Sequence, residues 1–290
     1  MNTTHRANSM RSQLNKVPEV TATFWIIKVL ATTVGETAAD FLNVTLNFGL
    51  TGVSVTMSML LLVALVLQFR LKRFVPAVYW LAIVLISIVG TLITDNLIDA
   101  GLPLAVTTVL FAIALGGTFV LWFRVERSLS IHSVTTRARE TFYWLAVLFT
   151  FALGTAAGDL LAEELNLGYL ASLALFFGAI VVVALAYFVF SLNAVLAFWM
   201  AYVLTRPLGA TTGDLLAQNP ADGGLGLGTT ATSVAFLAVI LVLVLVLTVK
   251  ARARAPLAQP VLTQSVSTQP VQTQPVLTQP SVDEVRVSRK

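Results

Sequence analysis

The sequence contains no cysteine, two histidines and very few charged residues. Without cysteine there can be no disulfide, no thiolate metal site and no cysteine nucleophile. The histidines, His5 and His132, lie outside the long apolar segments, which argues against a histidine-based metal site or a Ser-His-Asp triad inside them. Only 11% of the 290 residues are charged, against about 25% in a soluble domain, so lipid must surround much of the chain.

Hydrophobic residues make up 57% of the chain and gather in long segments. A helix needs roughly 20 residues to cross a hydrocarbon core of about 30 Å. The polar N-terminus lacks the pattern of a cleaved signal peptide, so we expect the first segment to be retained. The sequence predicts an all-α integral membrane protein with about eight transmembrane helices, at approximately 21–42, 50–69, 75–98, 102–123, 140–162, 168–190, 192–217 and 229–249.

Basic residues are confined to few places. Sixteen of the 18 fall in the N-terminal segment, in residues 70–73, in residues 124–139 or from Lys250 onward. In an eight-span arrangement these clusters share one side, so the positive-inside rule places both termini in the cytoplasm. Short basic clusters between apolar spans fit membrane topology and anionic headgroups better than nucleic acid, so we expect a lipid bilayer and no nucleic acid as partner. Nothing in the sequence indicates an oligomeric state.

One pattern occurs four times without a gap. An aromatic residue precedes a Trp, and Gly, Asp and Leu follow that Trp at ten, fifteen and seventeen positions. Each copy covers two predicted spans, so all four enter the membrane from the same side as parallel repeats. The intervals between successive Trp residues suggest that a half containing two repeats was duplicated. The copies are Phe24-Trp25/Gly35/Asp40/Leu42, Tyr79-Trp80/Gly90/Asp95/Leu97, Tyr143-Trp144/Gly154/Asp159/Leu161 and Phe198-Trp199/Gly209/Asp214/Leu216.

This pattern resembles a bacterial membrane-protein family known only as a repeat of unknown function, in which four tandem copies each contain two transmembrane regions and a characteristic Trp. The resemblance covers roughly residues 20–250 and implies residence in the bacterial inner membrane, but no activity. The chain then divides into a cytoplasmic segment (1–20), repeat 1 (21–73), repeat 2 with a basic cytoplasmic loop (74–139), repeat 3 (140–191), repeat 4 (192–250) and a TQPV-rich cytoplasmic tail (251–290). We expect the tail to be disordered, as a flexible appendage or as a docking peptide.

The repeated Trp and Gly residues have structural explanations. Trp25, Trp80, Trp144 and Trp199 follow cytoplasmic segments, so their rings are expected to anchor the helices at the membrane interface, with substrate stacking as the alternative. Glycine lets helices approach closely, so Gly35, Gly90, Gly154 and Gly209 are expected to mediate helix packing. A hinge is an alternative only in the fourth copy, because Pro207 precedes Gly209.

The repeated Asp residues lie in the outer half of the bilayer, about 22 Å beyond their Trp residues. A carboxylate at this depth is costly unless it faces protein or water. Parallel repeats would place all four at one depth, as a ring or as two pairs that attract cations or exchange protons. If the chain binds a metal, these four are the candidate ligands, although capping a turn or contacting headgroup water would also explain them. They are Asp40, Asp95, Asp159 and Asp214.

Three further ionisable residues lie inside the predicted spans. Lys28, Glu36 and Asp40 share one face of the first span with Thr32, because they recur every four residues. Arg206 occupies the position in the fourth copy that Thr32 has in the first. Lys28 and Arg206 are the only basic residues inside the spans, so each is expected to face carboxylates. They form either structural ion pairs or a coupled set of the kind that a cation-linked carrier uses.

Three functions follow from these features. The leading hypothesis is a small secondary transporter or exporter of a cation, divalent or coupled to protons, that uses the four Asp residues and Glu36. The alternative is a membrane scaffold or regulatory protein whose polar stripes serve helix packing. An enzyme is the weakest hypothesis, since no nucleophile–base pair or metal-binding His motif is found. We expect no cofactor other than a transported cation.

Overall fold

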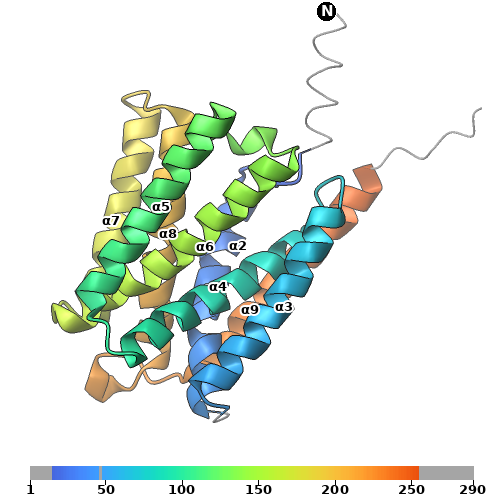
Figure 1. Ribbon diagram of the computed structural model, residues 1–290. Helices are drawn as coiled ribbons and strands as arrows, with labels where there is room; N and C mark the ends of the chain where they lie inside the picture. The colour runs from blue at the N-terminus through green and yellow to red at the C-terminus, as the bar shows by residue number, and fades with distance from the viewer. Residues whose placement is uncertain (1–14, 46–47, 255–290) are drawn as a thin grey trace, which may run out of the picture. The chain divides into compact units, whose positions relative to one another are not determined.

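A computed structural model describes residues 15–45 and 48–254, and every regular element within them is helical (Figure 1). Seven of these helices are long and apolar enough to cross a membrane. An eighth, α2 (Ala22–Asp40), lies at the first predicted span but carries Lys28, Glu36 and Asp40. The seven are α3 (Leu50–Arg70), α4 (Pro76–Asp99), α5 (Leu104–Glu126), α6 (Arg137–Asp159), α7 (Tyr169–Phe188), α8 (Ala194–Ala217) and α9 (Thr229–Arg254).

Each helix lies within a few residues of a predicted span, and local sequence explains several of the boundaries. Thr21 and Thr136 cap α2 and α6 by accepting a backbone hydrogen bond from the third residue after each. Residues 251–254 of the predicted tail belong to the last turn of α9, and the rest of the tail falls outside the described residues, so its disorder stays a prediction. The short 3₁₀ helices η2 (Ile131–Ser133) and η4 (Pro220–Asp222) lie in connections.

Repeats 1 and 3 share a local feature that the described residues of the other two repeats lack. In both, a π-helical turn follows the repeated Asp directly, as η1 (Phe41–Thr45) after α2 and as η3 (Leu160–Glu164) after α6. The alternation of this turn supports the interpretation that a half containing two repeats was duplicated. A glycine with positive φ precedes the second helix in repeats 1, 3 and 4, as Gly49 at 73°, Gly168 at 77° and Gly228 at 78°.

The helices form an inner and an outer set. The first helix of each repeat is inner (α2, α4, α6 and α8), and the second is outer (α3, α5, α7 and α9). In the most apolar stretches of α4, α6 and α8, 56–67% of the residues are buried, against 17–22% in the outer helices. The inner helices therefore make the core, and the outer helices present apolar side chains outward, as a lipid environment requires.

The inner helices form a closed ring. Helix α2 packs against α4, α4 against α6, α6 against α8, and α8 against α2. Each outer helix packs against the inner helix of the following repeat, so that α3 covers α4, α5 covers α6 and α7 covers α8. The same rule connects the last repeat to the first, since Ser233 of α9 donates a hydrogen bond of 2.7 Å to Thr37 of α2. The repeats thus follow one another around a common axis.

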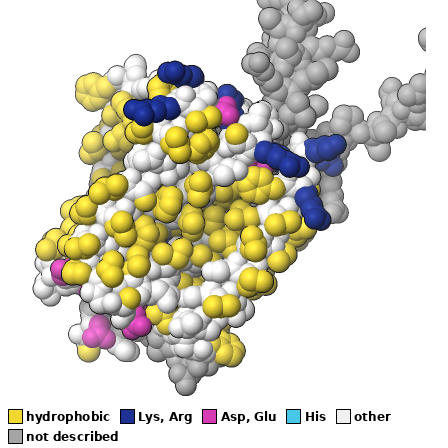
Figure 2. All heavy atoms as spheres, viewed as in Figure 1, with side chains coloured by type: hydrophobic (Ala, Val, Ile, Leu, Met, Phe, Trp, Pro, Cys, Tyr) yellow, Lys and Arg dark blue, Asp and Glu magenta, His cyan; other side chains and the backbone are white. Residues whose placement is uncertain are grey.

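Basic side chains gather at one end of the helices. Figure 2 shows Lys and Arg side chains where α5 leads to α6 and α3 leads to α4, with a few acidic side chains among them, whereas acidic side chains alone are visible at the opposite end and a broad apolar band lies between. The four inner helices all begin at the basic end, as parallel repeats require.

Candidate functional site

An aromatic layer joins the four inner helices near their first turns. The aromatic residue before each repeated Trp contacts the Trp of the next repeat, and the last contact returns from repeat 4 to repeat 1. Tyr79 and Tyr143 also share a hydrogen bond of 2.5 Å between their hydroxyl groups. The ring centroids are 5.7 Å apart for Phe24–Trp80, 5.6 Å for Tyr79–Trp144, 6.2 Å for Tyr143–Trp199 and 5.7 Å for Phe198–Trp25.

The repeated glycines form a second layer, and each lies against the next inner helix. A Cβ on any of the four would come within 3.0 Å of a neighbouring atom, so a side chain there would force the helices apart. The predicted packing role is consistent with this geometry. In each case the nearest neighbour stands seven positions after the Trp of the next repeat: Ser87 for Gly35, Phe151 for Gly90, Arg206 for Gly154 and Thr32 for Gly209.

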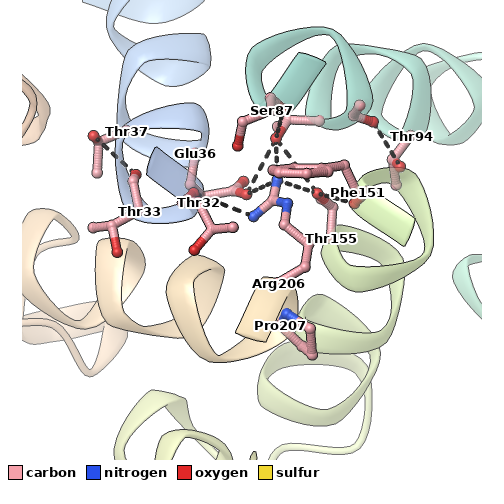
Figure 3. Close-up of polar contacts among 12 residues, drawn as sticks. Thr32, Thr33, Glu36, Thr37, Ser87, Thr94, Phe151, Thr155, Arg206 and Pro207 are labelled. Atoms are coloured by element: carbon pink, nitrogen blue, oxygen red, sulfur yellow. Dashed lines mark hydrogen bonds and ion pairs between the residues drawn. The ribbon is translucent and has the colours of Figure 1, made fainter. Parts of the chain in front are cut away.

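Arg206 lies on the axis of the ring and binds residues from all three other repeats (Figure 3). One guanidinium nitrogen, Nη2, lies 2.9 Å from Glu36 Oε2, 2.5 Å from Thr91 Oγ1 and 2.6 Å from Thr155 Oγ1. Glu36, Thr91 and Thr155 all stand eleven positions after their Trp residues, so pseudo-symmetry brings them together. The side chain of Arg206 is fully buried, which makes this a desolvated ion pair.

Lys28 lies elsewhere on the axis and makes no ion pair with any residue of 15–45 or 48–254. Its side chain is fully buried, and Nζ lies 4.1 Å from the ring centroid of Phe151 and 4.3 Å from that of Tyr202. Arg206 Cζ lies 5.6 Å from the same Phe151 ring. The prediction that each basic residue faces carboxylates therefore holds for Arg206 and is wrong for Lys28, because aromatic π faces take the place of the expected acid.

The four repeated Asp residues form a carboxylate layer beyond Arg206. They stand at equivalent positions on the four inner helices, five residues beyond the repeated glycines, so the ring of helices places them at one level. Asp214 is buried, and Asp40 accepts a hydrogen bond from Gln218 at 3.5 Å. Within the described residues, no three His, Asp or Glu side chains lie close enough to hold a metal ion.

Comparison with known families agrees with this cyclic arrangement. A family model described as Repeat of Unknown Function (DUF347) matches four consecutive segments, residues 23–74, 78–128, 142–192 and 197–253. The chain belongs to this family. No curated protein and no solved structure matches it. Each DUF347 repeat contains one inner and one outer helix, so the match confirms four tandem two-helix repeats.

The structure corrects the expected role of the DUF347 Trp residues. Trp80, Trp144 and Trp199 are at most 5% exposed, packed between inner helices instead of facing the membrane interface. Only Trp25 is half-buried and suits an interfacial ring. The anchor prediction is wrong for the three buried residues, because the aromatic partner of the preceding repeat covers each of them. The hinge at Pro207 finds no support, since α8 runs without a break from Ala194 to Ala217.

Several residues in and near the site were not among the predicted site residues. Phe151 and Tyr202 flank Lys28, Thr91 and Thr155 bind Arg206, and the exposed Glu163 follows Asp159 by four residues and accepts a hydrogen bond from Tyr169. Thr91, Thr155 and Glu163 continue the four-residue stripes that contain the DUF347 Asp residues, which is the sequence feature that indicates them. Phe151 and Tyr202 could be found only by superposing all four repeats, since neither is polar enough to mark a stripe.

Proposed function

We propose that this protein is a cation-linked secondary transporter of the bacterial inner membrane, with the axis of the inner helices as its pathway. The carboxylate layer is the observation that carries the proposal. Four acids recur at equivalent positions of the four inner helices, in an otherwise apolar bundle. Acids at membrane depth are costly, and they typically mark an ion or proton path. No feature of the axis favours catalysis.

The neighbouring Arg206 supplies a means of coupling. Its guanidinium pairs with Glu36 and also attracts Asp95 and Asp159. A cation or proton that enters the layer competes with Arg206 for these carboxylates, and its arrival weakens the contacts that hold the four inner helices together. A single proton or monovalent cation fits this arrangement better than a divalent ion, which would need the carboxylates to move closer together.

The two ends of the axis differ in a way that suits alternating access. At the basic end the axis is closed by the aromatic layer and by the segment before α2. In that segment Lys16 pairs with Glu140 at 2.5 Å and donates to Phe69 O at 3.3 Å. The acidic layer lies toward the other end. With α2 counted as a span, the basic end faces the cytoplasm and both termini lie there.

Flux measurements on the full chain in proteoliposomes test the proposal. Dye-reported proton flux and uptake of Na⁺, K⁺, Mg²⁺ and Mn²⁺ would be compared for wild type and for single Asp→Asn variants at the four positions. We expect flux in the wild type and a loss of at least about tenfold in each variant. Asp222→Asn is the matched control, because Asp222 is exposed in η4, away from the axis. Undiminished flux in all four variants would exclude this pathway.

A scaffold function is the second candidate, favoured by the way Arg206 ties the repeats together. If the polar axis serves only packing, the same Asn variants lower the thermal stability and no wild-type flux is found with any ion tested. The flux measurement on the wild type alone therefore distinguishes the two functions: a transporter gives ion flux, and a scaffold gives none.

A further inference from the structure

An apolar trough runs along the outside of the junction between the first and last repeats. Its volume is about 760 Å³, within the range of ligand-binding pockets. Helix α8 forms the floor through a stripe that includes Ala194, Ala197 and Ala201, while α7 and the start of α2 form the walls. The small side chains of the stripe leave the trough deep.

The neighbouring repeat fills the corresponding space with its own side chains. Phe119 and Trp122 of α5 pack against Trp199, with ring centroids 4.9 and 5.8 Å away. Repeat 3 follows repeat 2 at an offset of 64 positions (Trp80 to Trp144), so the equivalents of Phe119 and Trp122 on α7 are Val183 and Ala186. These smaller residues do not reach Trp25, which is why Trp25 is half-buried while its three counterparts are buried.

The dimensions of the trough match one chain of a lipid. Its floor extends from Ala194 to Leu208, about 21 Å of helix, and its α7 wall from Phe177 to Phe188, about 16 Å. One leaflet of the hydrocarbon core is about 15 Å thick. The trough starts at the basic end of the helices, so it spans the leaflet on that side. Phe177 and Phe188 are 57% and 79% exposed, which leaves the trough open to the membrane.

The polar end of the trough is basic. His132 and Ser130 line it, and they belong to residues 124–139, a segment with four arginines that covers the connection between α5 and α6 and the adjoining helix ends. Arg127, two residues before the lining residue Leu129, is exposed and has no ion-pair partner among the described residues. A basic cluster beside an apolar slot complements an anionic headgroup with an acyl chain below it.

We propose that this trough is a binding site for an anionic phospholipid, with one acyl chain along the alanine stripe of α8 and the headgroup at residues 124–139. The bound chain covers the α2–α8 junction and completes the packing that Phe119 and Trp122 provide one repeat earlier. The proposal is independent of whether the protein transports an ion.

Native mass spectrometry of the full chain, delipidated and then titrated with phosphatidylglycerol or phosphatidylcholine, tests the site. We expect one phosphatidylglycerol to bind about tenfold more tightly than phosphatidylcholine, and Ala184→Trp, a change at a residue that lines the trough, to weaken it by about tenfold by filling the trough. The matched control is Val182→Trp on the same helix, because Val182 is 65% exposed and does not line the trough. Arg127→Asn, which tolerates the positive φ of 55° at this position, should reduce the preference for phosphatidylglycerol.

Three results would overturn the proposal. Ala184→Trp could bind phosphatidylglycerol as tightly as Val182→Trp does, which would place the lipid elsewhere. The two lipids could bind equally well to the wild type, which would remove the role of the basic connection. A free fatty acid could displace phosphatidylglycerol at equal concentration, which would make the headgroup irrelevant.

Discussion

Arg206 and Glu36 show how a buried charge is accommodated on the axis. A lone guanidinium would be prohibitively costly at this depth, and the pair is tolerated because Thr91, Thr155 and a carboxylate satisfy one nitrogen together. Lys28 lacks such a set and relies on two aromatic faces. The two basic residues therefore differ in how firmly each is held, although both are fully buried.

The Arg206–Glu36 pair predicts a non-additive effect on stability. Replacing only the arginine (Arg206→Met) leaves Glu36 buried without its partner and should destabilise the protein by about 3–5 kcal/mol. The double change, Arg206→Met with Glu36→Gln, removes both charges and should cost clearly less. Thermal unfolding of the purified protein in one detergent measures both. A double variant less stable than Arg206→Met would show that the pair is not the source of the effect.

Close contact between inner helices depends on the glycine layer. Each repeated glycine meets the next helix where a methyl group has no room, while Gly117 of α5 has no atom within 4 Å of where its Cβ would be. Replacing glycine by alanine should therefore disturb helix packing at the repeated positions of the inner helices but not at Gly117 of the outer helix α5. Helix propensity alone favours alanine over glycine by up to about 1 kcal/mol in a helix interior.

Alanine substitutions should separate these two environments. Gly154→Ala and Gly209→Ala should lower stability by about 1–3 kcal/mol, because the added methyl overpacks the contact with α8 or α2. Gly117→Ala, the matched control, should leave stability unchanged or raise it slightly. The midpoint of thermal unfolding reports each change. Equal midpoints for all three variants would mean that the ring is looser than the glycine contacts imply.

At the level of elements, most of the fold could be predicted because it follows from spacing within one chain segment. Hydropathy located the helices, and the repeat identified Gly35 and its counterparts as packing positions. Burial of Trp80 could not be predicted, since Phe24, a ring that covers it, comes from a different repeat. The neighbours of Lys28 were missed for the same reason: Phe151 and Tyr202 are distant in sequence, and only the cyclic arrangement of helices brings them together.

The whole molecule is a ring that is closed without a covalent link. Repeat 4 completes the ring, because α8 packs against α2 and Ser233 of α9 donates a hydrogen bond to Thr37 of α2. Repeat 1 thus packs against repeat 4 in the way that each later repeat packs against the one before it. The proposed lipid trough lies on this same junction. A ring needs every inner helix to cross the membrane in one direction, so α2 must be a span although, with three charges, it is not among the seven helices apolar enough to cross by composition alone. This requirement gives the topology a direct test.

The absence of native cysteine makes single-cysteine labelling a clean measurement of topology. In intact cells, a membrane-impermeant maleimide should label Phe48→Cys and Asp222→Cys, both exposed in connections at the acidic end. Glu19→Cys and Thr135→Cys, both exposed at the basic end, should be labelled only in inverted vesicles. Because Glu19 and Phe48 lie on either side of α2, labelling of both from one face would show that α2 does not cross. The closed ring of four parallel inner helices could then not exist in the membrane, and the proposed transport pathway along its axis would be excluded.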